Sequence, residues 1–225
     1  MKLYYDGASN KEISELFDLG VISGVTTNLS FCKKAMNENS IEYQDLLTSI
    51  HQNVSNKKND FSLSMQVSAT EPNLMIDEAS IFQSKFSKGV DLKVKIPLNY
   101  SNYGVVNSLI KKNISVNATC VTGFMQAIVA ANLGCRYISF FWGKMTDEDI
   151  DPYMMVSEFR NLLDKNNLNK TSNILVGSIR QPQVISEAFK AGADIVTTQF
   201  QNFPKFLNQL KSNEANELFQ KDWNS

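Results

Sequence analysis

The segment Asp91-Leu92-Lys93-Val94-Lys95-Ile96-Pro97 is the most informative stretch of the sequence. Side chains alternate along a strand, so Asp91 and both lysines share one face and three apolar residues share the other. Burying an ammonium group is costly unless it is paired or neutralised. Each lysine is therefore either a paired structural charge or an amine prepared to act as a nucleophile. For an isolated pair of this kind the structural explanation is the default, with Asp91 as the partner of Lys93.

Similar short apolar runs, rich in Val, Ile and aromatic residues, lie on both sides of this strand and alternate with helical patterns. The predicted strands are Lys2–Asp6, Gly24–Thr27, Ser62–Ala69, Asp91–Ile96, Ser115–Cys120, Tyr137–Phe141, Ile174–Ser178 and Ile195–Thr198. The predicted helices are Lys11–Asp18, Ile41–Asn53, Pro72–Phe86, Tyr103–Lys111, Thr122–Asn132, Pro152–Lys165 and Pro182–Lys190. This alternation indicates right-handed βαβ units and a parallel sheet.

Eight strands in 225 residues favour one closed (β/α)₈ TIM barrel, predicted as a single domain over residues 1–225 with a helical tail in 203–225. An open doubly wound sheet is the alternative, but no G-x-G-x-x-G follows the first strand. In the tail, an amphipathic helix is expected over Phe206–Trp223. Its apolar residues either meet a partner subunit or pack on their own barrel: Leu207, Leu210, Leu218, Phe219 and Trp223.

Composition argues against several classes of function. A formal net charge of -1 provides no electrostatic attraction for nucleic acid or an anionic membrane. No apolar run reaches the roughly 18 residues of a membrane span, and the polar amino terminus predicts no signal peptide. The three cysteines are widely spaced, which favours a reduced, cytoplasmic location over disulfides or a zinc site. The one histidine, His51, lies in a polar stretch and is predicted to be a solvated surface residue.

Polar residues gather at the carboxyl ends of the predicted strands, where barrel enzymes place their chemistry. The set holds one carboxylate, one buried-type amine, neutral hydrogen-bonding groups and one strong cation, and no metal-ligand cluster. A carboxylate with a desolvated lysine is what Schiff-base carbonyl chemistry needs. Individually, Asp6 could instead cap a helix and Asn28 could be a turn residue. The strand-end set is Asp6, Thr26, Asn28, Gln66, Lys95, Asn117, Thr119, Ser139, Phe141, Ser178 and Arg180.

The chain resembles the small transaldolase and fructose-6-phosphate aldolase family over nearly its whole length. Its first strand with Asp6 looks like the family's opening strand, and Gly24-Val25-Thr26-Thr27-Asn28 matches the family's G-V-T-T-N. The segment ending in Pro97 is similar to V-V-K-V-P, which selects Lys95 rather than Lys93 as the Schiff-base lysine. Four further segments resemble family motifs in the right order: Val116–Thr119 with Phe124–Ala127, Ser139–Lys144, Gly177–Arg180 and Phe219–Trp223.

The resemblance implies a metal-independent transfer of a dihydroxyacetone unit between sugar phosphates, without a cofactor. Lys95 would form the Schiff base, Asp6 would move the proton, and Gln66 and Thr119 would hold an ordered water. Substrate hydroxyls would be bound by Asn28, Asn117 and Ser139, and the terminal anion by Ser178 and Arg180. It also implies a homo-oligomer, with a decamer among the sizes that the family forms.

Some positions depart from the family pattern. Lys144 replaces an arginine and Trp142 a small aliphatic residue, which leaves a sulfonate or another variant sugar open beside phosphate. Gly7-Ala8-Ser9 replaces a polar turn and could widen the mouth of the site. Gln66 resembles the aldolases, whereas Phe141 resembles the transaldolases because a phenyl ring cannot polarise water. We therefore predict a transaldolase, with an aldolase that releases free dihydroxyacetone, or a sugar-phosphate-binding barrel that has lost catalysis, as alternatives.

Overall fold

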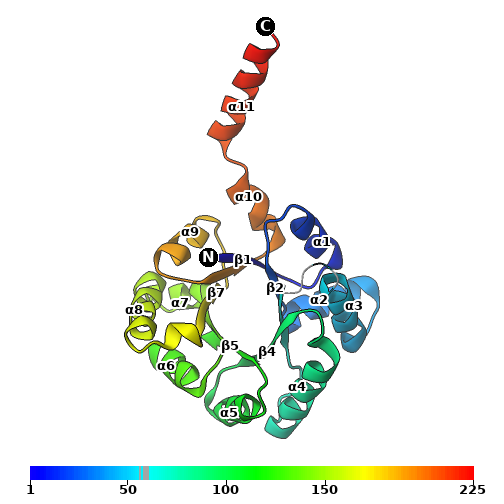
Figure 1. Ribbon diagram of the computed structural model, residues 1–225, viewed down its shortest axis with the longest axis vertical. Helices are drawn as coiled ribbons and strands as arrows, with labels where there is room; N and C mark the ends of the chain where they lie inside the picture. The colour runs from blue at the N-terminus through cyan, green and yellow to red at the C-terminus, as the bar shows by residue number, and fades with distance from the viewer. Residues whose placement is uncertain (56, 58–60) are drawn as a thin grey trace.

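The structure is a computed structural model that describes residues 1–55, 57 and 61–225. Its centre is a closed barrel of parallel strands that pair in sequence order, each with its neighbour and the last with the first (Figure 1). The predicted (β/α)₈ barrel is thereby confirmed. The strands are β1 (Lys2–Asp6), β2 (Gly24–Thr26), β3 (Ser62–Gln66), β4 (Asp91–Pro97), β5 (Val116–Val121), β6 (Tyr137–Phe141), β7 (Asn173–Gly177) and β8 (Ile195–Thr198).

Helices surround the barrel and cover the outer face of its strands (Figure 1). They are α1 (Asn10–Asp18), α2 (Leu29–Asn39), α3 (Tyr43–Ser55), α4 (Pro72–Phe86), α5 (Tyr103–Lys111), α6 (Phe124–Leu133), α7 (Trp142–Asp147), α8 (Pro152–Lys165) and α9 (Gln183–Lys190). The sequence pattern missed α2 and α7. Helix α2 is polar and rich in Asn and Lys, and α7 is under two turns long, so neither carries a strong apolar period.

Strands β2, β3, β4, β5 and β7 differ from their predicted bounds, and the differences in β3 and β5 have local causes. Strand β3 ends at Gln66 rather than Ala69, because the amides of Ser68 and Ala69 donate to the Glu78 carboxylate at 2.8 Å instead of pairing with a strand. Strand β5 extends to Val121 through a register shift, where Cys120 takes a left-handed φ of 64°. A bulge of this kind turns side chains at a strand end, which here is the end nearest the predicted site.

A polar network fills the barrel interior near the amino-terminal ends of the strands. The hydroxyl of Tyr137 lies 3.0 Å from those of both Tyr4 and Ser62. Lys93, whose side chain is only 2% exposed, forms an ion pair with the half-exposed Asp91 and lies 5.2 Å from the centre of the Tyr137 ring. The structural role expected for Lys93 is therefore confirmed, and this end of the barrel is filled.

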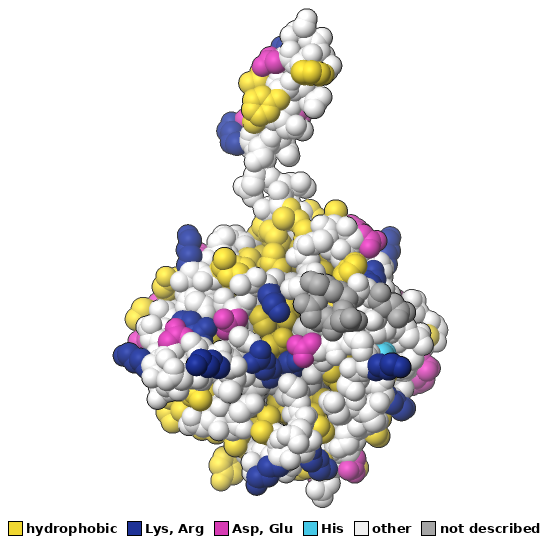
Figure 2. Space-filling model, in the orientation of Figure 1, with side chains coloured by type: hydrophobic (Ala, Val, Ile, Leu, Met, Phe, Trp, Pro, Cys, Tyr) yellow, Lys and Arg dark blue, Asp and Glu magenta, His cyan; other side chains and the backbone are white. Residues whose placement is uncertain are grey.

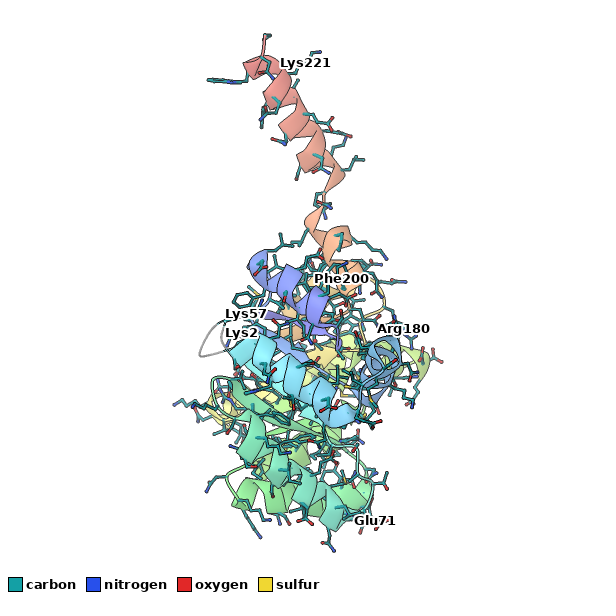
Figure 3. All side chains as sticks on the ribbon, turned by 90° about the vertical axis from the view of Figure 1, so that its right-hand side faces the viewer. Lys2, Lys57, Glu71, Arg180, Phe200 and Lys221 are labelled. Atoms are coloured by element: carbon teal, nitrogen blue, oxygen red, sulfur yellow. The ribbon has the colours of Figure 1, made fainter. Side chains whose placement is uncertain are left out.

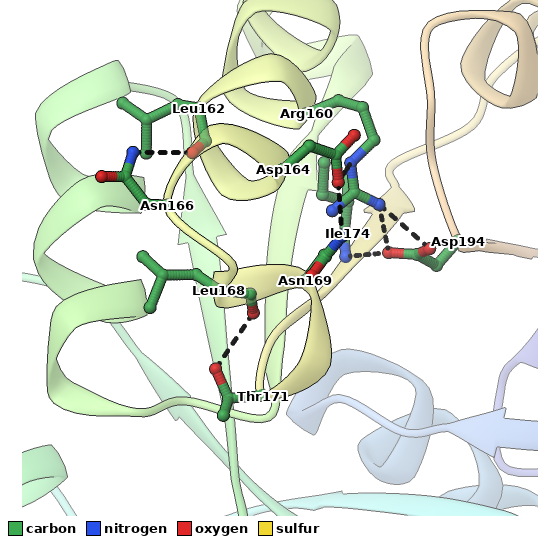
Figure 4. Close-up of polar contacts among 9 residues, drawn as sticks. All are labelled: Arg160, Leu162, Asp164, Asn166, Leu168, Asn169, Thr171, Ile174 and Asp194. Atoms are coloured by element: carbon green, nitrogen blue, oxygen red, sulfur yellow. Dashed lines mark hydrogen bonds and ion pairs between the residues drawn. The ribbon is translucent and has the colours of Figure 1, made fainter.

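An ion pair ties an outer helix to the strand entries on the same side (Figure 4). Arg160 of α8 donates to both carboxylate oxygens of Asp194 at 3.1 and 3.2 Å, and Asp194 accepts from the amide of Ile174 at 2.8 Å. Because Asp194 also accepts from the Lys2 amide through its backbone carbonyl at 2.9 Å, the starts of β1, β7 and β8 are held together.

His51 is half-buried, so the prediction of a solvated surface residue is only partly confirmed. Its Nε2 lies 2.9 Å from the carbonyl oxygen of Lys88, and its ring packs 5.6 Å from that of Phe86. The polar sequence around His51 belongs to helix α3, whose other face is apolar, and the histidine lies at the border. It remains distant in the fold from the strand ends that carry the predicted chemistry.

The tail forms two helices instead of the single one predicted. Helix α10 (Phe203–Leu207) packs beside the barrel, the chain is extended at Asn208, and α11 (Leu210–Trp223) stands away from the barrel (Figure 1). Apolar side chains lie exposed on this projecting part (Figure 2), and Trp223 is 86% exposed. Helix α11 therefore does not pack on its own barrel. None of the helices in the described part of the chain is long and apolar enough to cross a bilayer.

Candidate active site

A cavity of about 390 Å³ opens at the carboxyl ends of the barrel strands. This is the side of the barrel on which Arg180 lies, opposite Lys2 at the start of β1 (Figure 3). All of the predicted site residues line this cavity except Lys144 and Arg180. The lining consists of Asp6, Thr26, Asn28, Leu29, Ser30, Phe31, Gln66, Lys95, Asn117, Thr119, Cys120, Ser139, Phe141, Leu175, Gly177, Ser178, Thr197 and Gln199.

Lys95 extends from β4 into the base of this cavity and is 5% exposed. Its Nζ donates a hydrogen bond of 2.9 Å to the carbonyl oxygen of Thr27. Such a bond orients the amine, and when the amine is neutral it leaves the nitrogen lone pair free. The position two residues beyond Lys93 on the same strand face thus places one lysine in the cavity and the other beneath it.

Asp6 is the last residue of β1, and its carboxylate is hydrogen-bonded to Thr26, which in turn is hydrogen-bonded to Thr197. The hydroxyl of Thr26 lies 2.9 Å from the Asp6 carboxylate and 2.7 Å from the hydroxyl of Thr197. A hydroxyl has one proton, so when Thr26 donates to ionised Asp6 it accepts from Thr197. The carboxylate is consequently fixed in orientation by strands β2 and β8.

Burial shifts the pKa values of the two ionisable groups toward their neutral forms. It lowers the pKa of Lys95 below its ordinary value, although the charge of Asp6 opposes the shift. It raises the pKa of the Asp6 carboxyl, opposed by the charge of Lys95 and by the hydrogen bond from Thr26. Burial therefore favours the unprotonated form of the Lys95 amine and the protonated form of the Asp6 carboxyl, which is suited to proton exchange during a reaction.

Part of the remaining cavity wall is a chain of neutral polar groups. Ser139 donates to the Asn117 side-chain oxygen at 2.6 Å, and the Asn117 amide donates to Ser64 at 3.1 Å. These bonds fix the amide orientation of Asn117. The hydroxyl of Thr119 is buried and has no hydrogen-bond partner in the described part of the chain. Since buried polar groups are normally paired, this hydroxyl is available to a water or a substrate atom.

Three further predicted residues are located by the loops that follow their strands. Asn28 caps α2, because its side chain accepts from the Phe31 amide at 3.0 Å, and it also faces the cavity. The two readings of Asn28 are therefore compatible. Gln66 is anchored through its backbone oxygen, which accepts from the Tyr43 hydroxyl at 2.5 Å. Phe141 lines the cavity at the start of α7.

The expected anion-binding residues are only partly brought together. Ser178 lines the cavity, but Arg180 points out of it and donates to both carboxylate oxygens of Asp147 at 2.5 Å. Lys144 also lies outside the lining, with its Nζ 3.8 Å from Asp147. The expectation that these two cations face the cavity is corrected for the structure as it stands. The sequence pattern did not indicate Asp147 as a site residue, because Asp147 belongs to helix α7, which was not predicted.

The sequence also missed Cys120, Thr197 and Gln199 among the cavity residues. Thr197 and Gln199 lie at the end of β8, so the signal for them in the sequence is their position at the carboxyl end of the eighth predicted strand. Cys120 is turned to the cavity by the bulge in β5, which has no signal in the sequence. Among the described residues, no group of three His, Cys, Asp or Glu side chains could hold a metal ion.

Comparisons with known proteins identify relatives over nearly the whole chain. A protein called "Probable transaldolase" from Thermoplasma volcanium is 31% identical over 99% of this chain and 95% of its own length. A protein with the same name from Halalkalibacterium halodurans is 30% identical over the full length of both chains.

Solved structures support the fold alone. The structure titled "Native KDPGal structure" is 12% identical, covers 87% of this chain and 80% of that chain, and has a TM-score of 0.57. A flavocytochrome b2 mutant with benzoylformate is 13% identical with a TM-score of 0.61, over 89% of this chain and only 57% of its own length.

The family profile described as Transaldolase/Fructose-6-phosphate aldolase matches residues 3–224. The chain therefore belongs to the transaldolase/fructose-6-phosphate aldolase family.

Proposed function

We propose that the protein is a transaldolase that moves a dihydroxyacetone unit from a ketose phosphate, such as fructose 6-phosphate, to an aldose phosphate. The observation that carries the proposal is the buried Lys95 amine in a polar cavity, where the charge of Asp6 acts on its pKa. A desolvated amine with a nearby carboxyl group is suited to attack a carbonyl and to manage the protons that follow.

In the proposed reaction, the Lys95 amine adds to the C2 ketone of the donor and forms a carbinolamine. Loss of water gives an iminium ion. Asp6 then takes the proton of the C4 hydroxyl, the C3–C4 bond breaks, and an aldehyde leaves while the bond electrons pass into the iminium to form an enamine. The enamine adds through C3 to the acceptor aldehyde, Asp6 returns the proton, and water releases the product from Lys95.

The other polar and charged groups of the site have supporting roles in this proposal. Gln66 and the hydroxyl of Thr119, which has no hydrogen-bond partner among the described residues, hold the water that is lost and regained. The hydroxyls of the three-carbon unit are bound by Asn28, Asn117 and Ser139, while Thr26 orients Asp6. Ser178 and Arg180 bind the terminal anion, with Lys144 beside them.

Phe141 favours transfer over release. A phenyl ring at the cavity wall supplies no hydroxyl to activate water, so the enamine persists until an acceptor arrives. The aldolase alternative is favoured by Gln66 and predicts free dihydroxyacetone from fructose 6-phosphate alone. Assay of dihydroxyacetone with and without an acceptor aldehyde distinguishes the two reactions.

The lysine assignment is tested by reduction with borohydride in the presence of a ketose phosphate. We expect a three-carbon adduct on the peptide that contains Lys95, and no adduct on the Lys95→Met variant. The matched control is Lys93→Met, which should still be labelled. A label that survives in Lys95→Met would refute the assignment, and tight ligand binding without any adduct would favour a barrel that has lost catalysis.

We also propose that the protein acts in the cytoplasm as a homo-oligomer, with a decamer among the sizes to be tested. The support is helix α11, whose Leu218, Phe219 and Trp223 are 55%, 67% and 86% exposed on a helix that stands away from the barrel. Exposed apolar side chains gathered in this way are typical of an interface with another chain.

A further inference from the structure

The cations expected to bind the substrate's terminal anion are already occupied by a carboxylate of the same chain. Arg180 donates two parallel hydrogen bonds of 2.5 Å to the two oxygens of Asp147. Lys144, three residues before Asp147 on α7, has its Nζ 3.8 Å from the same carboxylate. A guanidinium group binds a phosphate, sulfonate or carboxylate in this two-pronged manner, so Asp147 occupies the donors of Arg180 that would bind a ligand anion.

The pair lies at the edge of the cavity. A Cβ built on Gly143 would come within 2.9 Å of Nε of Arg180 and 3.0 Å of the Ser178 hydroxyl, so both groups flank this glycine. Ser178 lines the cavity, and the amide of Gly143 donates to the Ser178 carbonyl at 3.1 Å. The Arg180 side chain therefore passes beside Ser178, although its guanidinium is paired with Asp147.

The pair is also exposed enough to be exchanged. The side chains of Arg180 and Asp147 are 53% and 41% exposed, so water can solvate Asp147 once it is released. Asp147 moreover lies in the last turn of α7, where the helix dipole opposes a negative charge. Its carboxylate thus depends on Arg180 and Lys144 for stabilisation, and both would be available to a more highly charged ligand.

We infer that Asp147 is an internal competitor for the anion subsite, which the charged end of the substrate must displace from Arg180. This inference rests on the proposed function, since it concerns the same site. A phosphate carries nearly two negative charges at neutral pH and can displace the singly charged carboxylate. A sugar with an uncharged end gains nothing from doing so. Asp147 is then a specificity-determining residue that lowers the affinity for anionic substrates, most for the weakly charged ones, without touching the reacting atoms.

The test compares Asp147→Asn with Glu148→Gln, a control that removes the same charge from the next residue and leaves the Arg180 pair in place. An exposed ion pair of good geometry is worth about fivefold in an equilibrium. We expect Asp147→Asn to lower KM for a ketose phosphate by about that factor and to leave KM for the free ketose unchanged. The gain should appear in KM and not in kcat, because chemistry at Lys95 is not altered. Asp147→Ala should behave in the same way.

Binding of inorganic phosphate, measured by the shift in thermal unfolding temperature or by calorimetry, supplies a readout that does not need catalysis. We expect binding to Asp147→Asn to be about fivefold tighter than to the unaltered protein or to Glu148→Gln. Unchanged or weaker phosphate binding would overturn the inference, as would an equal gain for the free ketose or for the control. If borohydride finds no Lys95 adduct but phosphate binding tightens as stated, the proposed function fails and the competition by Asp147 stands.

Discussion

Replacing Asp91 and Lys93 one at a time should change the free energy of unfolding in opposite directions. Lys93 is 2% exposed, whereas its partner Asp91 is 51% exposed. In Lys93→Met the buried charge disappears, the side-chain volume is kept, and the remaining carboxylate is solvated. In Asp91→Asn the ammonium stays buried beside the Tyr137 ring without its anion.

The expected sizes follow from this difference in burial. Removal of one partner costs about 3–5 kcal/mol for fully buried pairs and about 0–1 kcal/mol for exposed ones, so Asp91→Asn should cost about 2 kcal/mol. Replacement of a buried charge by an apolar side chain is neutral or stabilising, so Lys93→Met should change stability by between 0 and about +2 kcal/mol.

The pH dependence gives a second measure. Burial lowers the pKa of Lys93, while Asp91 opposes this shift. The unfolded chain therefore binds more protons than the folded one between the two pKa values, and stability rises with pH toward the unfolded value of about 10.4. This rise should be larger in Asp91→Asn, because the opposing charge is gone.

The assay is urea unfolding at matched protein concentrations, followed by fluorescence of the buried Trp142, which is 6% exposed. Matched concentrations are needed because any association would add to the apparent stability. The reasoning is refuted if Lys93→Met destabilises the barrel as much as Asp91→Asn does, or if the cost of Asp91→Asn grows as the pH rises.

Three further outcomes are expected. Thr119→Val should lower turnover by about 100-fold with an unchanged unfolding midpoint, because its hydroxyl has no partner in the described part of the chain; a parallel loss of stability would contradict this. In Asp6→Asn, the pKa of Lys95 should fall further, so borohydride trapping should begin at lower pH while carbon–carbon cleavage slows; a shift to higher pH would exclude the assigned pairing. Truncation after Asn208 should reduce the mass found by light scattering and leave the barrel's circular dichroism intact, and an unchanged mass would show that α11 does not mediate assembly.

Most of the barrel could be predicted because its signals are local. Strands β1, β6 and β8 and helices α4, α5 and α8 have the predicted bounds, since each combines an apolar period with a proline, glycine or polar boundary. Helices α2 and α7 lack such a period, and the break at Asn208 depends on how α10 meets the barrel. The polar run around His51 did not predict its contact with Lys88 and Phe86, because these residues come from another helix and its following loop.

The sequence by itself determined the order of strands and which residues lie at their ends, since alternation along a strand needs no knowledge of the rest of the chain. It thereby placed Asp6 and Lys95 at strand ends and both lysines on one face with Asp91, while the choice of Lys95 over Lys93 came from the resemblance to the family. Only the tertiary structure decided what each charge meets across the loops. Arg180 and Asp147 are 33 residues apart, and their pairing depends on the turn of α7 against the loop after β7. Distances between such groups, and the water excluded around them, exist only once the barrel has closed.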